Sequence, residues 1–180
     1  MVKAYNKDIM DWEEFPPYDV MFTDPPWQQQ ALSMFQTMLK KNTGIVKNYT
    51  IDQILEQLAR LSSTKKPCII AYSNKGSELV IQTMKRYGHT YNGIYERMQS
   101  MGRPHVLIVF NDFDNVIKIP DAKGLDIVTK TLEAIPFVGV VFDAFAGIGK
   151  TAEATQKAGW QYIGSEINAS RYSKLVKVIK

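Results

Sequence analysis

Apolar residues recur along the chain in two patterns, short runs typical of strands and longer segments with helical spacing. The short runs predict strands over residues 2–6, 18–23, 67–74, 90–97, 104–111, 139–145 and 161–167. Within residues 29–41, the apolar side chains recur at the intervals of one helix face, at Leu32, Phe35, Met38 and Leu39. Further helices are predicted over residues 50–61, 76–87, 123–135, 149–159 and 170–180.

The alternation of strands with helices predicts an α/β protein whose seven-stranded sheet is doubly wound and mostly parallel. Residues 90–97 and 104–111 are joined by a connection too short for a helical crossover, so this pair is expected to be antiparallel. Residues 50–53, Thr-Ile-Asp-Gln, have the form of a capping box. No linker divides the 180 residues, and their number suits one domain with one core.

The composition is ordinary for a globular protein, with 45% apolar and 22% charged residues. No apolar run approaches the roughly 20 residues that cross a bilayer, and the first residues lack the apolar stretch of a signal peptide. The one cysteine, Cys68, lies in an apolar run that favours a buried structural thiol, and these features together favour the cytoplasm. His89 and His105 form no metal-ligand spacing with it, so no metal site is predicted and both are expected at the surface or at strand edges.

Residues 143–151, Asp-Ala-Phe-Ala-Gly-Ile-Gly-Lys-Thr, fit two kinds of ligand loop. Residues 144–151 match the loose Walker A pattern that binds phosphate, whereas 143–149 match the loop that holds S-adenosylmethionine in methyltransferases. Both need a strand, a glycine turn and a helix N-terminus with free N–H groups, so the loop alone does not decide. Asp143 at the strand end suits a ligand with an ammonium group, and Glu166 at the tip of the next strand suits ribose hydroxyls.

The most specific motif is Asp-Pro-Pro-Trp at residues 24–27, directly after the apolar strand 18–23. D-P-P-[YFW] in this place resembles motif IV of the amino-methyltransferases that methylate adenine N6. Around it, residues 2–27 resemble the third and fourth strands of that family, and residues 48–111 are similar to the central region of its MT-A70-like branch. Residues 123–172 resemble the cofactor half of the β-class DNA amino-methyltransferases, although they depart from its pattern at Lys123-Gly124 and at Ala144.

This resemblance covers nearly the whole chain and implies one Rossmann-like methyltransferase domain with circularly permuted motifs. The catalytic half would occupy residues 1–111 and the cofactor-binding half residues 112–180, with no separate target-recognition domain. By the same resemblance the cofactor is S-adenosylmethionine, and the residues expected to bind it are Asp8, Asp24, Asp143, Ala144, Phe145, Gly147, Gly149, Glu166 and Asn168.

The expected catalytic residues are Asp24, Pro25, Pro26 and Trp27, because the exocyclic amine of adenine is a poor nucleophile. Asp24 and the carbonyl of Pro25 can each accept one N6–H bond, which favours a pyramidal nitrogen as positive charge develops. Trp27 offers a flat face on which the base stacks. The residues expected to contact the substrate are Trp27, Asn74, Lys41, Lys47, Arg97 and Arg103.

The sequence thus predicts a methyltransferase that acts on adenine N6 in DNA. RNA adenine is the nearest alternative, while a P-loop ATPase and a catalytically silent partner subunit are interpretations of other classes. The net charge of +4 agrees with a nucleic-acid partner. Without a recognition domain, three explanations stay open: short or weak specificity, a homodimer or partner subunit that supplies target recognition, or a single-stranded target. The small size hints at a phage origin.

Overall fold

One sheet organises the computed structural model, which describes residues 2–44, 46–98 and 104–180. Seven strands within these residues form it in the order β1-β7-β6-β2-β3-β5-β4. Their bounds are Val2–Tyr5 (β1), Val20–Thr23 (β2), Cys68–Tyr72 (β3), Tyr91–Met98 (β4), Pro104–Phe110 (β5), Val140–Asp143 (β6) and Gln161–Ser165 (β7). In this spatial order, β1, β7, β6, β2 and β3 are all parallel to one another. Strand β5 runs antiparallel to both β3 and β4. The predicted fold class and the antiparallel pair are therefore confirmed.

Six helices and two short 3-10 turns connect the strands in the described part of the chain. The helices are Gln29–Thr43 (α1), Ile51–Leu61 (α2), Ser77–Arg86 (α3), Leu125–Glu133 (α4), Lys150–Lys157 (α5) and Ala169–Val178 (α6). The turns are Ile9–Asp11 (η1) and Asn74–Gly76 (η2). The capping box is confirmed, because the Gln53 amide N–H donates to Thr50 Oγ1 and the Thr50 amide N–H donates to Gln53 Oε1.

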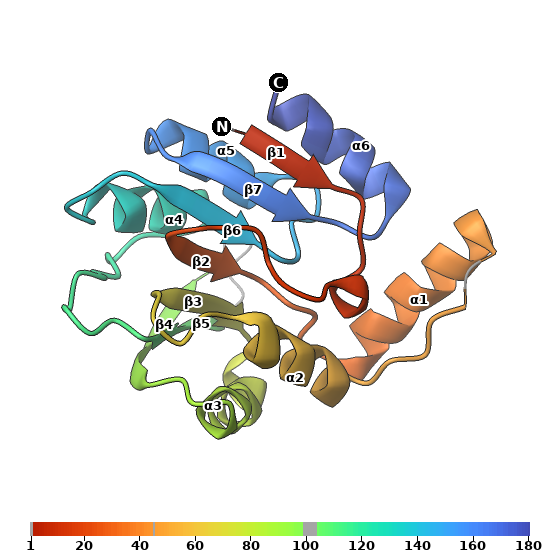
Figure 1. Ribbon diagram of the computed structural model, residues 1–180, viewed down its shortest axis with the longest axis horizontal. Helices are drawn as coiled ribbons and strands as arrows, with labels where there is room; N and C mark the ends of the chain where they lie inside the picture. Colours follow the sequence, from red (N-terminus) through yellow and green to blue (C-terminus); the bar gives the residue numbers. More distant parts are fainter. Residues whose placement is uncertain (1, 45, 99–103) are drawn as a thin grey trace.

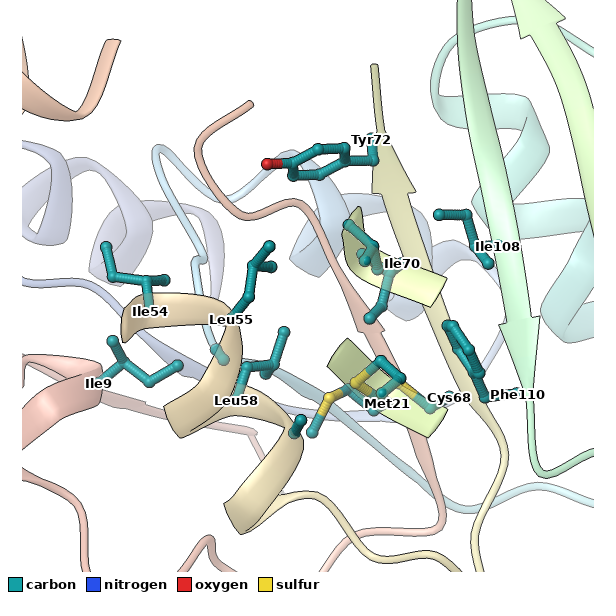
Figure 2. Close-up of a cluster of buried hydrophobic side chains, with 14 of the residues drawn as sticks. Ile9, Met21, Ile54, Leu55, Leu58, Cys68, Ile70, Tyr72, Ile108 and Phe110 are labelled. Atoms are coloured by element: carbon teal, nitrogen blue, oxygen red, sulfur yellow. The ribbon is translucent and has the colours of Figure 1, made fainter. Parts of the chain in front are cut away.

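Apolar side chains cover both faces of the sheet and hold three layers together. On one face, Leu55 and Leu58 of α2 pack over Met21 of β2 and Ile70 of β3 (Figure 2). On the other face, α4 and α5 pack on residues that alternate with these along the strands, including Phe22 (Figure 1). Each fully buried Leu or Ile side chain stabilises the fold by about 1.5–3 kcal/mol. Helices α1 to α3 therefore lie on one face, and α4 to α6 on the other.

Cys68 is buried as predicted, and burial raises the pKa of its thiol to about 12. The prediction for the two histidines is wrong, because both His89 and His105 are buried. The ring nitrogens of His89 meet partners from distant parts of the chain, and the ring of His105 stacks on Trp27, contacts that apolar periodicity does not reveal. Within the part of the chain that the structure describes, no helix is long and apolar enough to span a membrane.

His89 belongs to a hydrogen-bond network that joins three loops at the amino-terminal end of β3. Its Nε2 lies 2.9 Å from the carbonyl oxygen of Ala59, which can only accept, so Nε2 carries the proton. Its Nδ1 then accepts from Nδ2 of Asn111 across 2.8 Å. The same amide reaches the carbonyls of Ser63 and Lys66, each at 3.2 Å. Burial lowers the pKa of His89, which agrees with this neutral form.

We predict that Asn111→Ala lowers the free energy of unfolding by about 2 kcal/mol or more, because several buried polar groups lose their partner. Asn115→Ala is the matched control, since Asn115 is exposed and shares the left-handed backbone, with φ of 51° against 58° at Asn111. Urea unfolding of both variants measures the difference. An equal loss in the two variants would assign the effect to backbone strain and refute the network.

Candidate active site

The loops at the carboxyl ends of the parallel strands surround a pocket of about 630 Å³. Four strands contribute to its wall, through Asp8 after β1, Asp24 after β2, Ala144 after β6 and Glu166 after β7. Helix α1, which projects beside the sheet, closes another side (Figure 1). Ligand pockets in open α/β sheets form at this edge. The fold therefore brings the two sequence motifs, residues 24–27 and 143–149, to one pocket.

A buried hydrogen bond joins the strands that carry these motifs. The Thr23 hydroxyl at the end of β2 donates to Oδ1 of Asp143 at the end of β6, across 2.8 Å. Asp143 also accepts from the Phe145 amide at 3.0 Å and from the Tyr162 hydroxyl at 3.4 Å. Burial raises the pKa of Asp143 to about 6, and its hydrogen bonds act against the rise. Asp143 lies beneath the loop and is not among the pocket-lining residues, so its contact with an ammonium group stays a prediction.

The glycine loop begins earlier than the apolar pattern predicts, because β6 ends at Asp143 and leaves Ala144 and Phe145 outside the strand. Both of these residues and Gly147 line the pocket. Gly147 has a φ of 56°, which favours glycine.

Gly149 serves packing rather than the pocket wall. Its φ is 94°, and a Cβ there would lie 3.1 Å from Leu175 and 3.2 Å from Val178. Glycine at this position lets α6 approach the start of α5, and Gly149 is not among the residues that line the pocket. Its predicted contact with the cofactor is therefore not seen in this geometry and stays a prediction.

Glu166 and Asn168 form a polar corner where β7 turns into α6. Glu166 is buried and accepts from the Asn168 amide across 2.7 Å through Oε1. Burial raises the pKa of Glu166, and this hydrogen bond acts against the rise. Asn168 caps α6 through a hydrogen bond from the Arg171 amide at 3.1 Å. Both side chains line the pocket.

Asp8 follows β1, the strand next to β7, and is paired with a lysine from the segment after α1. Its Oδ1 accepts from the Met10 amide at 3.0 Å, and its Oδ2 lies 3.3 Å from Nζ of Lys47. Lys47 also lies 3.2 Å from Oδ1 of Asp11. Lys47 thus lines the pocket as predicted for a ligand contact, but its charge is matched by two carboxylates of the protein.

The Asp24 carboxylate sits where the rigid Pro25-Pro26 turn leaves β2, and Trp27 binds back to it. The Trp27 indole N–H donates to Oδ1 of Asp24 across 2.5 Å. Burial among protein atoms raises the pKa of Asp24 to about 7, the Trp27 hydrogen bond acts against the rise, and the charge of Asp143 adds to it. Because Asp24 is exposed toward the pocket, water solvates it there, and the rise is strongest when a ligand fills that space.

Three predicted substrate contacts do not line the pocket. Lys41 is exposed near the end of α1, and Asn74 donates to Oε1 of Glu96 at 3.2 Å. Arg97 donates to the carbonyls of Pro120 at 2.8 Å and of Ile119 at 3.0 Å, which ties β4 to the segment before α4. Arg103 lies outside the described residues.

Several pocket residues escaped the sequence analysis. Arg171 of α6 places its guanidinium 4.4 Å from the centre of the Phe35 ring of α1, and both residues line the pocket. Its position one helical turn after Asn168 could have marked Arg171, whereas nothing local marks Phe35. Lys7 and Lys150 also line the wall, so four cations face the three carboxylates of Asp8, Asp24 and Glu166. The described residues contain no group of three or more His, Cys, Asp or Glu side chains that could hold a metal ion.

No protein-family model matches the chain, and no curated protein matches it in sequence. Solved structures do match. M1.HpyAVI in its complex with SAM has a TM-score of 0.70 at 16% identity, over 98% of this chain and 99% of that one. TTHA0409 from Thermus thermophilus, described as a putative DNA modification methylase and complexed with S-adenosyl-L-methionine, has a TM-score of 0.63 at 13% identity, over 99% and 95%.

A third similar structure is the PvuII DNA methyltransferase, which is cytosine-N4-specific, with a TM-score of 0.65 at 9% identity over 98% of this chain and 86% of that one. The likeness extends over nearly the full length of all three proteins. At these identities it establishes the fold, and the chain has the fold of the DNA methyltransferases.

Proposed function

We propose that the protein transfers a methyl group from S-adenosylmethionine to the N6 amine of adenine in DNA. One observation carries this proposal: the loop of residues 24–27 and the glycine loop of residues 143–149 open from adjacent strands into one pocket. A methyl transfer requires the donor and the amine side by side. A pocket that is lined by both loops can hold the donor and the amine in this way.

The size of the pocket and several of its lining groups suit the proposed donor. About 630 Å³ lies within the range of small-molecule sites. Glu166, at the tip of β7, is placed to accept ribose hydroxyls, and the backbone at Gly147 allows close approach of a ligand. Two of the similar structures were solved with this donor. When bound, the donor supplies a methyl group on a positively charged sulfur, which the carboxylates of Asp24 and Glu166 would stabilise, whereas Asp8 is already paired with Lys47.

The chain's own residues would prepare the amine for attack. Asp24 accepts one N6–H and the Pro25 carbonyl accepts the other, which draws the nitrogen lone pair out of the ring system. The N–C bond would then form as the C–S bond breaks, sulfur would keep the electron pair, and the N6 proton would pass to the Asp24 carboxylate or to water. The ionised Asp24 beside the nitrogen stabilises the positive charge that develops there. Trp27 provides the stacking face for the base.

The choice of adenine rests on the acidic residue at the head of the 24–27 motif, and the choice of DNA rests on the similar structures. The PvuII enzyme in that set is cytosine-specific, so cytosine N4 is an outcome that the assay must separate. RNA adenine is a further outcome for the same reason. We further propose that a dimer or a partner subunit supplies target recognition.

A P-loop ATPase is the alternative of another class. Against it, Asp24 and Glu166 line the pocket and would face the anionic phosphates, although the cations Lys7, Lys47, Lys150 and Arg171 lie there as well. The two functions differ in the ligand that stabilises the folded protein.

A methyl-transfer assay tests the proposed reaction. Purified protein with methyl-labelled donor and duplex DNA, single-stranded DNA or RNA should yield N6-methyladenine, detected by mass spectrometry of the digested nucleosides. Asp24→Asn should lower the rate by about 100-fold or more, because it removes the charge beside the developing cation. The exposed Asp121→Asn is the matched control and should keep the rate. Equal activity of the Asp24 and Asp121 variants would contradict the catalytic role of Asp24.

The second prediction concerns donor recognition. S-adenosylmethionine should raise the melting temperature and ATP should not, because only a ligand of the native state stabilises it. Glu166→Gln should weaken donor binding by about tenfold or more, since a hydrogen bond to a charged group is lost. Glu153→Gln on α5, paired with Lys157 outside the pocket, is the control. Stabilisation by ATP alone would favour the P-loop function instead.

The third prediction follows from the raised pKa of Asp24 and concerns stability. The folded state holds the Asp24 proton more tightly than the unfolded chain does, so the stabilisation from this group is present at low pH and is lost as pH rises through about 7. Asp24→Asn mimics the neutral acid. Thermal melts should show the variant gaining stability over the parent between pH 5 and pH 8, in the absence of ligand. A constant difference across that range would contradict the perturbed carboxyl group.

A further inference from the structure

We propose that His105 is a positioning residue that holds the Trp27 indole in the plane on which the target base stacks. The inference deepens the proposed function and rests on it for the identity of the base. It concerns a histidine that the sequence analysis expected to be a peripheral polar residue.

The two rings form an offset stack at the edge of the pocket. The imidazole of His105 and the indole of Trp27 lie within 15° of parallel, with ring centres 6.3 Å apart. Aromatic pairs favour this arrangement at centre distances of about 4.5–7 Å. His105 is buried and does not line the pocket, whereas Trp27 is half-buried and does. His105 therefore supports the indole from behind, while Trp27 itself reaches the pocket wall.

The sheet register explains why His105 can reach Trp27. The pairing of β3 with β5 ends at Tyr72 and Val106, so His105 lies one residue beyond the end of β3. It remains held by β4, where it pairs with Arg97. The loop of residues 24–27 leaves the sheet from β2, on the other side of β3. Trp27 thus spans the end of β3 and meets a ring that is anchored in a different strand.

The stack differs in kind from the second restraint on Trp27, the hydrogen bond from its indole N–H to Asp24. A target amine that donates to Asp24 competes with Trp27 for the same carboxylate. The contact with His105 involves the face of the ring and does not depend on that carboxylate. Once Asp24 turns to the substrate, the stack with His105 keeps the orientation of the indole, together with the packing of Trp27 on the apolar cluster.

Two variants separate a flat support from any other role of the histidine. His105→Ala removes the support and frees the indole to rotate, whereas His105→Phe keeps a flat ring of similar size. We expect His105→Ala to lower kcat/KM for DNA by up to about tenfold, the range of one aromatic pair. Donor affinity should not change, because the donor's predicted contacts lie on other strands. His105→Phe should restore most of the loss.

Fluorine NMR tests the positioning directly and without catalysis. The chain has 3 tryptophans, so 5-fluorotryptophan labelling gives three signals, and Trp27→Phe identifies that of Trp27. His105→Ala should shift or broaden the Trp27 signal and leave those of Trp12 and Trp160 unchanged, while His105→Phe should keep a single sharp Trp27 signal. An unchanged Trp27 signal would overturn the proposal, and so would a change in all three signals, which would mean general loosening of the fold.

The kinetic and spectroscopic experiments distinguish a failure of the proposed function from a failure of the proposed role of His105. If the parent protein methylates no nucleic acid, the proposed function is lost, and the fluorine signals still decide whether His105 holds Trp27. If methylation is present and His105→Ala changes donor affinity as much as DNA kinetics, the positioning role is lost and the function stands.

Discussion

The candidate site depends on the parallel pairing of β2 with β6, which places two loops from opposite ends of the chain side by side. Met21 pairs with Phe142 in this register, and the Thr23 hydroxyl then meets the Asp143 carboxylate at the point where both strands end. Because the loops that follow parallel strands begin at the same edge of the sheet, residues 24–27 and the glycine loop share one pocket. A shift of register would separate Thr23 from Asp143 and move the two loops apart.

Charge is the second organising feature of the site, and it works against stability. Burial raises the pKa of Asp24, Asp143 and Glu166, so ionising each carboxyl group costs the folded protein free energy. Neighbouring donors, such as Thr23 to Asp143 and the Asn168 amide to Glu166, offset part of that cost. Under the proposed function a cationic donor would offset more of it. The free energy that ionised carboxylates cost the free protein would thus be recovered when a cation binds and when positive charge develops on the substrate.

Local pattern predicted most of the fold, and its errors have physical causes. Strand and helix periods depend on nearby residues, so the elements and the antiparallel pair were predictable from the sequence. The strand at 139–145 was predicted too long, because Ala144 and Phe145 stay apolar where the chain turns into the pocket. The placement of His89 and His105 was wrong, since Asn111 and Trp27 come from other elements. Lys47 and Arg97 were predicted from their charge as substrate contacts, and both contacts stay predictions. Lys47 lines the pocket but is paired with Asp8, and Arg97 donates to the carbonyl of Pro120.

The central claim is that the pocket joins a methyl donor to the N6 amine of adenine, and a base-resolved transfer assay tests it most directly. Two pools of DNA duplexes would be incubated separately with labelled donor. In the first pool, adenine is the only base with an exocyclic amine on the target strand. In the second pool, cytosine takes that place. The complementary strands would be pre-methylated at their own exocyclic amines. We predict label on adenine as N6-methyladenine and none on cytosine. Label on cytosine N4 would contradict the choice of base, and a donor that binds without any transfer would contradict the catalytic claim itself.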